Sequence, residues 1–442
     1  MNTINSLQVV DHERRRFLGK SAMSIAFASA TGLLSTPSAA GDASAIRPFR
    51  IDTPEAALVD LRRRIAATRW PDRETVADSS QGVQLATMRE LASYWAKKYD
   101  WRKCEAKLNS LPQFITEIDG LDIHFIHVRS KHENALPLIV THGWPGSVVE
   151  QLKIVGPLSN PTAFGANASD AFHLVIPSLP GYGFSGRPTT TGWGPERTAR
   201  AWVSLMKRLG YGKFASQGGD LGGIVSNVMA KQAPPELLGI HINFPATVPA
   251  DIAKALLIGA PPPSGLSDDE RHAYQQLSNL STRRAYALEQ GTRPQTLYGL
   301  ADSPIALASW LLDHPDGYGQ PAAAIASAVA GYPVDGYSAG EVTRDDVLDD
   351  IMLYWLTNTG ISAARFYWES HFNFYAAADV SIPAAVSAFP GENYQAPKSW
   401  SERAYHNLIY YNKPETGGHF AAWEQPQLFA QEVRAGLRPL RT

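Results

Sequence analysis

The sequence has little cysteine and no surplus of positive charge. A single cysteine, Cys104, excludes an intramolecular disulfide and a cysteine-rich structural zinc site. The 40 lysine and arginine residues are balanced by 42 aspartate and glutamate residues. The chain therefore lacks the basic excess with which proteins neutralise nucleic-acid phosphates, and we expect no nucleic-acid partner.

Charged residues of both signs are also few, at 19% of the 442 residues, whereas hydrophobic residues make up 44%. This balance excludes a disordered chain and a charged coiled coil. The 35 glycines and 31 prolines are only slightly above ordinary usage, which excludes low-complexity and collagen-like structure. The composition predicts a folded chain with a large core, of enzyme-like character.

Residues 1–40 have the pattern of an export signal. The run Arg14-Arg15-Arg16-Phe17-Leu18 precedes a modest apolar run, Ser21 to Leu34, which the small residues Ser38-Ala39-Ala40 follow. The paired arginines resemble a twin-arginine signal, which would export a folded protein to the periplasm or out of the cell. The apolar run is short for a membrane span, so we expect no stable membrane insertion after cleavage. A second cleavage point after Ala43-Ser44-Ala45 and an uncleaved or disordered tail stay open.

The middle of the chain alternates between strand-like and helical segments. A helical stretch passes through Leu91, Tyr94 and Trp95 toward Trp101, and strands flank the Asp119-Gly120 turn. Three buried-type strands follow, each ending in a turn, at 136–141, 172–177 and 214–217. Their alternation with helical segments predicts an α/β fold with a doubly wound, mostly parallel sheet. Catalytic groups of such sheets lie at the carboxyl ends of the strands.

The turn after the third strand, Gly218-Gly219-Asp220-Leu221-Gly222, has the spacing of a nucleophile elbow with aspartate in place of serine. Glycines leave room in so tight a turn, and the amino end of the following helix stabilises a carboxylate. We therefore predict that Asp220 is an ionised nucleophile that attacks carbon, although an aspartate that only caps the helix would give the same pattern.

Two other segments complete this prediction. The turn His142-Gly143-Trp144-Pro145 can supply the backbone N–H of Trp144, and Leu221 can supply another, which together predict an oxyanion hole. His419, in Gly417-Gly418-His419 near the carboxyl terminus, has the place of the base in the order nucleophile, acid, histidine.

Taken in order, these segments resemble the microsomal-type epoxide hydrolases of the α/β-hydrolase superfamily. The resemblance covers nearly everything after the export signal. It implies an α/β-hydrolase fold with an N-terminal region at 46–135 that wraps the core, a core split into 136–245 and 376–442, and a helical lid at 246–375. It rests on these motifs: Trp70-Pro71, Trp101-Arg102, Pro112-Gln113-Phe114, His142-Gly143-Trp144-Pro145-Gly146-Ser147, Gln217-Gly218-Gly219-Asp220 and Gly417-Gly418-His419-Phe420-Ala421-Ala422-Trp423-Glu424.

The resemblance also implies roles for single residues. It matches Asp220 to the nucleophile and His419 to the base, and it matches Glu392, at the end of Ser387-Ala388-Phe389-Pro390-Gly391-Glu392, to the acid that orients the base. Asp379 is the rival for the acid. Tyr367 matches one of the two lid tyrosines that hydrogen-bond to the epoxide oxygen.

For the second lid tyrosine, Tyr286 stands where the family places it, and core aromatic residues are the alternative for both tyrosines. The chain departs from the family at Leu221, where many relatives carry tryptophan beside the nucleophile. The donor there is the backbone, so the oxyanion hole is unaffected, but the pocket wall changes.

The resemblance implies an epoxide hydrolase that converts a small-molecule epoxide to a vicinal diol through an alkyl ester on Asp220, with neither metal nor organic cofactor. A haloalkane-type dehalogenase uses the same Asp and His chemistry but needs halide donors, often a tryptophan at the position of Leu221. A non-catalytic binding protein on the same scaffold is the alternative from another class. The sequence leaves the oligomeric state open, a homo-oligomer included.

Overall fold

The computed structural model describes residues 44–281, 283–371 and 377–441. The predicted export signal at 1–40 lies outside these residues. All described residues belong to one compact unit that spans residues 43–442. Among them, no helix is both long and apolar enough to cross a membrane.

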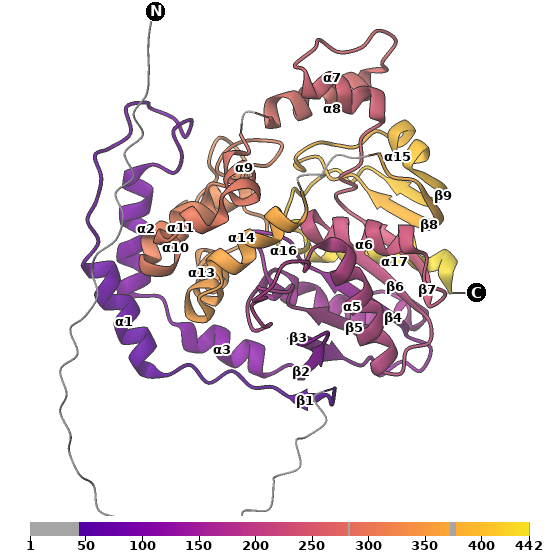
Figure 1. Cartoon of the computed structure of the whole chain (residues 1–442), viewed down its shortest axis with the longest axis horizontal. Coiled ribbons are helices and arrows are strands. Elements are labelled where there is room, and N and C mark those ends of the chain that lie inside the picture. The colour runs from indigo at the N-terminus through magenta and orange to yellow at the C-terminus, as the bar shows by residue number, and fades with distance from the viewer. Residues whose placement is uncertain (1–43, 282, 372–376, 442) are drawn as a thin grey trace, which may run out of the picture. The chain divides into compact units, whose positions relative to one another are not determined.

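A nine-stranded sheet forms the centre of this unit (Figure 1), and its strand order is β1-β2-β3-β5-β4-β6-β7-β8-β9. The six strands from β5 to β9 run parallel, whereas β1, β2 and β3 pair antiparallel at one edge. The bounds are β1 Arg47–Pro48, β2 Gln113–Ile118, β3 Leu121–Val128, β4 Leu136–Thr141, β5 Phe172–Pro177, β6 Phe214–Gly218, β7 Leu237–Ile242, β8 Val380–Ser387 and β9 Tyr405–Asn412. The predicted mostly parallel sheet is confirmed, as are the hairpin and the three strands before the turns.

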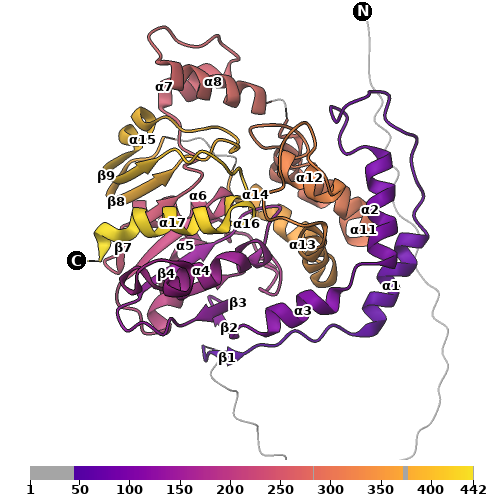
Figure 2. The same cartoon turned by 180° about the vertical axis from the view of Figure 1, so that it is seen from behind.

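Helices cover both faces of the sheet. Helices α5 (Pro195–Arg208) and α6 (Asp220–Gln232) lie over one face (Figure 1), and α4 (Val155–Ser159) and α17 (Pro426–Leu437) lie over the other (Figure 2). The central strand β4 is therefore buried on both sides, which explains why it reads as a continuous apolar run rather than an alternating one.

The N-terminal segment adds helices as well as strands. The predicted helical stretch through Leu91, Tyr94 and Trp95 toward Trp101 is confirmed as α2 (Leu85–Lys97), and a separate helix, α3 (Trp101–Asn109), follows it. Asp100 takes an extended backbone between them, and its side chain accepts from the N–H of Arg102, so it starts a new helix. With α1 (Glu55–Ala66), these helices form a layer, while the hairpin β2–β3 of the same segment extends the sheet.

Between β7 and β8 the chain leaves the sheet and forms the lid. Its helices are α7 Ala250–Leu257, α8 Asp268–Leu280, α9 Ala285–Thr292, α10 Gly299–Asp302, α11 Pro304–Leu312, α12 Ala323–Ala330, α13 Arg344–Thr357 and α14 Gly360–Glu369. The N-terminal helices pack against this lid, α1 and α2 on α11, α2 on α12, and α3 on α13. The indigo and orange ribbons lie side by side in both views (Figures 1 and 2).

Hydrogen bonds join the lid to the N-terminal segment and to the core. On the N-terminal side the hydroxyls of Tyr94 and Tyr99 donate to Asp345 and Asp349 of α13, at 2.7 and 2.6 Å. On the core side the hydroxyl of Ser147 donates to Asp350 of α13 at 2.5 Å. The turn after β4 is thereby fixed to the lid.

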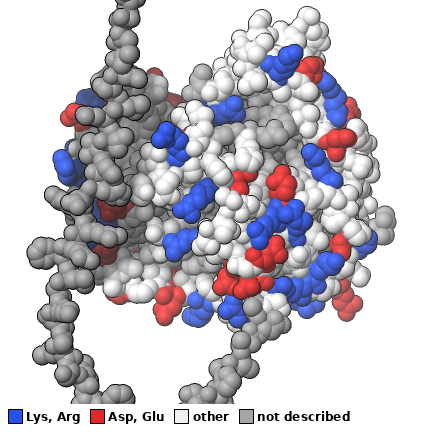
Figure 3. Space-filling model, in the orientation of Figure 1, with Lys and Arg blue, Asp and Glu red and all other residues white. Residues whose placement is uncertain are grey.

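The surface carries charges of both signs. On the face shown in Figure 3, lysine and arginine side chains are interspersed with aspartate and glutamate. This mixture agrees with the near balance of charge in the sequence.

Candidate active site

Asp220 stands at the sharp turn from β6 into α6, as the elbow spacing predicts. Its φ of 47° lies in the left-handed region, which is strained for a residue with a side chain. A Cβ on Gly218 would lie 2.1 Å from the carbonyl oxygen of Gly222, and one on Gly222 would lie 1.9 Å from that of Thr141. Only glycine fits either position, so the two small residues of the motif have the steric role that the spacing suggests.

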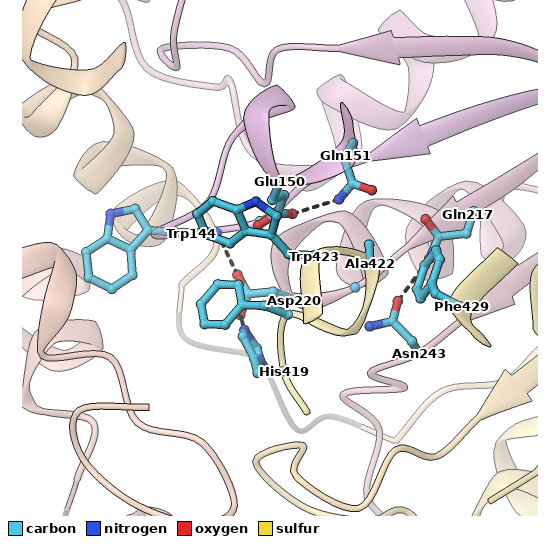
Figure 4. Close-up of a pocket in the computed structure, with 13 residues that line it drawn as sticks. Trp144, Glu150, Gln151, Gln217, Asp220, Asn243, His419, Ala422, Trp423 and Phe429 are labelled. Atoms are coloured by element: carbon cyan, nitrogen blue, oxygen red, sulfur yellow. Dashed lines mark hydrogen bonds and ion pairs between the residues drawn. The ribbon is translucent and has the colours of Figure 1, made fainter. Parts of the chain in front are cut away.

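The two expected backbone donors meet the Asp220 carboxylate. The N–H of Trp144 donates to Oδ1 at 2.9 Å (Figure 4), and the N–H of Leu221 also hydrogen-bonds to this side chain. Burial raises the pKa of Asp220, and His419 with these two donors opposes that rise. The bond from Trp144 thus holds Oδ1 in place, and Oδ2 is the oxygen that faces the base.

His419 connects Asp220 to Glu392. Its Nε2 lies 3.6 Å from Oδ2 of Asp220, and its Nδ1 lies 2.5 Å from Oε1 of Glu392. Glu392 is only 1% exposed, whereas the side chain of Asp379 is 85% exposed and pairs with His406 at 2.6 Å. The structure therefore brings Glu392, and not its rival, to the histidine.

These neighbours set the charge of the imidazole. Burial lowers the pKa of His419. The charges of Glu392 and Asp220 raise it by more than burial lowers it, so that the pKa is about 9. In the free enzyme His419 is thus an imidazolium near pH 7, held between two carboxylates.

Both lid tyrosines contact the Trp144 indole, and their ring centroids lie 6.0 Å apart. Tyr286, at the start of α9, stacks on Trp144 with ring centroids 4.6 Å apart, and Tyr367 of α14 meets the indole edge-on at 5.9 Å. Burial and the charge of Asp220 raise the pKa of Tyr367 well above its usual value. Its hydroxyl therefore stays protonated at neutral pH and can donate a hydrogen bond.

Two buried residues at the site were not expected from the sequence. His314 follows α11, and its ring centroid lies 4.5 Å from that of His419. Glu150, in the 3₁₀ helix Val148–Ile154, accepts from Gln151 at 2.7 Å, and burial raises its pKa to about 8. Neither residue had a sequence signal, because only tertiary contacts bury Glu150 and bring His314 to His419.

The space beside the nucleophile is small and largely polar. A cavity of about 20 Å³ touches Asp220 and His419 and is also lined by Glu150, Gln151 and Trp423 (Figure 4). This volume suits about one water molecule. Water therefore has room next to the carboxylate and the base.

Within the described residues, Asp220, His314 and His419 are the group whose donor atoms could meet one metal ion, since these atoms lie within 4.8 Å of one another. A metal ion there would coordinate the Asp220 oxygen that faces the base and the His419 nitrogen that must accept a proton. The arrangement therefore does not fit a resident catalytic metal, and the expectation of a reaction without metal or cofactor stays a prediction.

Known proteins are similar to this chain in sequence and in fold. Two family descriptions match, "Epoxide hydrolase N terminus" over residues 46–151 and "alpha/beta hydrolase fold" over residues 137–297. A Stigmatella aurantiaca protein named "Putative epoxide hydrolase" is 48% identical over 402 residues, which cover 90% of this chain and 86% of the relative. Epoxide hydrolase 1 of Sus scrofa is 34% identical over 416 residues, 90% of each chain. The crystal structure of juvenile hormone epoxide hydrolase from Bombyx mori aligns with a TM-score of 0.78 at 29% identity, over 90% of this chain and 95% of that one.

Proposed function

The chain belongs to the epoxide hydrolases of the α/β-hydrolase fold, which convert an epoxide and water to a vicinal diol, and we propose that its reaction passes through an alkyl ester on Asp220. The observation that carries this proposal is the alignment of Glu392, His419 and Asp220, with the N–H of Trp144 on the far oxygen of the carboxylate.

In the first step, Oδ2 of Asp220 attacks one carbon of the strained ring. The epoxide oxygen leaves as an alkoxide and needs hydrogen-bond donors and a proton. Tyr286 and Tyr367 supply both, because both rings contact Trp144, whose N–H meets the nucleophile, and Tyr367 is held protonated.

In the second step, His419 deprotonates a water that attacks Cγ of the ester. Oδ1 then becomes the oxyanion, and the N–H groups of Trp144 and Leu221 stabilise it. Esterification also removes the charge of Asp220, which is one of the charges that raise the pKa of His419. The first step therefore lowers the pKa of His419, so that more of this histidine is in the neutral, basic form that the second step needs.

A single turnover in heavy-oxygen water tests the ester. The oxygen delivered to the first diol comes from the Asp220 carboxylate, so that diol should be largely unlabelled and the label should enter the protein. Later diols should carry the label. A fully labelled first diol would mean that water attacks the epoxide directly.

The alternatives are not favoured. The relatives that match nearly the whole chain are epoxide hydrolases, and the buried Leu221 offers no side-chain donor to a halide. Assays for diol and for halide, run on an epoxide and a haloalkane, distinguish the reactions directly.

We also propose that residues 1–40 direct export through a twin-arginine pathway. Support comes from the sequence alone, from Arg14-Arg15-Arg16-Phe17-Leu18 before an apolar run and small residues. Replacement of Arg14, Arg15 and Arg16 by lysine should retain the protein in the cytoplasm. Unchanged export of that variant, or a wild-type protein found only in the cytoplasm, would refute the proposal.

A further inference from the structure

His314 is a buried polar side chain without a partner. It is 1% exposed, and neither ring nitrogen has a hydrogen-bond partner among the residues that the structure describes. Its ring lies against those of Tyr286, at 5.2 Å between centroids, and His419, at 4.5 Å, so it faces the reaction site. Buried polar atoms are nearly always satisfied by protein, water or ligand. Its position therefore indicates a small polar guest between His314 and the reacting groups.

The backbone fixes His314 in this place. The N–H of Ala322 donates to its carbonyl oxygen at 2.7 Å, and the carboxylate of Asp316 accepts from the N–H groups of Tyr318 and Gly319, both at 2.8 Å. The N–H of Gly317 donates to the carbonyl oxygen of Gly391, next to Glu392, at 3.1 Å. The loop that carries His314 is thus bound to the turn that carries the acid.

The spacing of three groups defines where the guest sits. One nitrogen of His314, one nitrogen of His419 and one carboxylate oxygen of Asp220 all lie within 4.8 Å of one another. For three atoms so placed there is a point no more than about 2.8 Å from each, which is hydrogen-bond distance for a water oxygen. A single water can therefore meet the nucleophile, the base and His314 at once.

We propose that His314 is a further catalytic residue, which accepts a hydrogen bond from the hydrolytic water and aims it at the ester on Asp220. This inference rests on the proposed function, because it assigns the water of the second step. A water held by His419 alone could turn about that hydrogen bond. His314, as a second hydrogen-bond acceptor, fixes the orientation of the water, so that a lone pair of the water oxygen points toward Cγ of Asp220.

The atoms of the step balance. The water oxygen bonds to Cγ, and the bond between Cγ and Oδ2 breaks. One water proton passes through Nε2 of His419 to Oδ2, which leaves with the diol. The other proton, held by His314 during the attack, stays on the new carboxyl group and then returns to the tyrosinate that ring opening left.

The electrostatic surroundings suit an acceptor. Burial and the neighbouring His419 keep the pKa of His314 well below its usual value, although the carbonyl of Pro315 opposes this shift. The ring is therefore neutral at neutral pH and presents one unprotonated nitrogen.

The test follows the two steps separately in single turnovers with enzyme in excess of an epoxide, and measures kcat and KM in steady state. His314→Phe keeps the ring and removes both nitrogens, whereas His314→Gln retains an acceptor. We expect ring opening in His314→Phe to stay within about twofold of wild type and ester hydrolysis to slow on the order of 10–100-fold, the usual effect of one hydrogen bond to a reacting group. The ester should accumulate, kcat and KM should fall together, and His314→Gln should recover part of the rate. Tyr367→Phe is the matched control, because Tyr367 also contacts Trp144, at the same 5.9 Å as His314, and should slow the other step.

Each result of these measurements either supports or overturns the role of His314. Hydrolysis of the ester at the wild-type rate in His314→Phe would overturn the inference, and so would a loss confined to ring opening and kcat/KM, since His314 would then act on the epoxide. If His314→Phe does not fold, His314→Met, with a flexible apolar side chain, undergoes the same measurement. A wild-type enzyme that forms no ester would refute the proposed function itself, which the His314 variants alone cannot do.

Discussion

Nδ1 of His419 lies 2.5 Å from Oε1 of Glu392, and both side chains are buried. The same carboxylate oxygen accepts from the N–H of Asn393 at 2.6 Å, which fixes its direction. Since a carboxylate only accepts hydrogen bonds, Nδ1 carries a proton and Nε2 is the nitrogen that faces Asp220. The base is thus oriented before any substrate arrives.

Replacement of the base should stop the reaction halfway. In His419→Gln the nucleophile remains, so the enzyme should react once with an epoxide and stall as the ester. Mass spectrometry should find one substrate mass on the peptide that contains Asp220, and Asp220→Ala should show neither adduct nor turnover. An adduct on another residue would contradict the assignment of the nucleophile.

Glu392→Gln should weaken the second step more than the first. The amide keeps the shape of the side chain but removes a charge that raises the pKa of His419 and stabilises its imidazolium. We expect kcat to fall by at least tenfold and kcat/KM to fall less, measured in steady state with one epoxide. Asp379→Asn, at the exposed rival carboxylate, is the control and should behave like wild type.

The lid tyrosines should affect ring opening. Tyr367→Phe removes one donor to the developing alkoxide, a change that in comparable oxyanion sites lowers rates on the order of 100–1,000-fold. Alkylation should slow by this factor in stopped-flow measurements while ester hydrolysis stays nearly intact. The double variant Tyr286→Phe, Tyr367→Phe should be far slower. Full activity in it would mean that both are core aromatic residues only.

The pKa of His419 should differ between the free enzyme and the ester. In the free enzyme burial lowers it, and Glu392, Asp220 and Glu150 raise it, to about 9. The ester lacks the charge of Asp220, so the pKa should fall, and ester hydrolysis in single turnovers should rise with pH to a plateau with a midpoint below 9. Nitrogen NMR of the free enzyme supplies the comparison. Equal midpoints would show that Asp220 does not influence the base.

Asp349 should contribute a loss of stability as pH rises through the weakly acidic range. Burial, aided by the charge of Asp346, raises the pKa of Asp349 to about 7, and the hydroxyl of Tyr99 opposes this rise. The unfolded chain releases the same proton near pH 4. Because the folded state binds more protons between about pH 4 and 7, its stability falls across that window. In Asp349→Asn the fall in the urea midpoint from pH 5 to pH 8 should be smaller, and an unchanged fall would contradict the assignment.

The sequence predicted the parts of the site that depend on local stereochemistry. The elbow at Asp220 was recognisable because only glycine fits at Gly218 and Gly222. The choice between Glu392 and Asp379 could also be made from strand direction. Asp379 precedes β8, whereas Glu392 follows its carboxyl end, where active sites of parallel sheets lie.

Features that depend on contacts between distant segments were out of reach. His314 belongs to a polar turn in the lid, and nothing in that turn indicates that it meets His419 more than a hundred residues later. Helix α3 was not predicted either. Its start depends on Asp100, whose carboxylate accepts from the N–H of Arg102 in the structure.

The bonds between the N-terminal helices and α13 define how this protein can be recombined with relatives. A chimera that exchanges the lid alone would leave Asp345 and Asp349 without the hydroxyls of Tyr94 and Tyr99, and would expose the apolar faces of α2 and α3. The exchangeable block is therefore discontinuous in the gene, with residues 55–109 and 250–369 inherited together. Libraries that shuffle both pieces as one should yield folded enzymes with new pockets, whereas a single crossover between them should mostly yield insoluble protein.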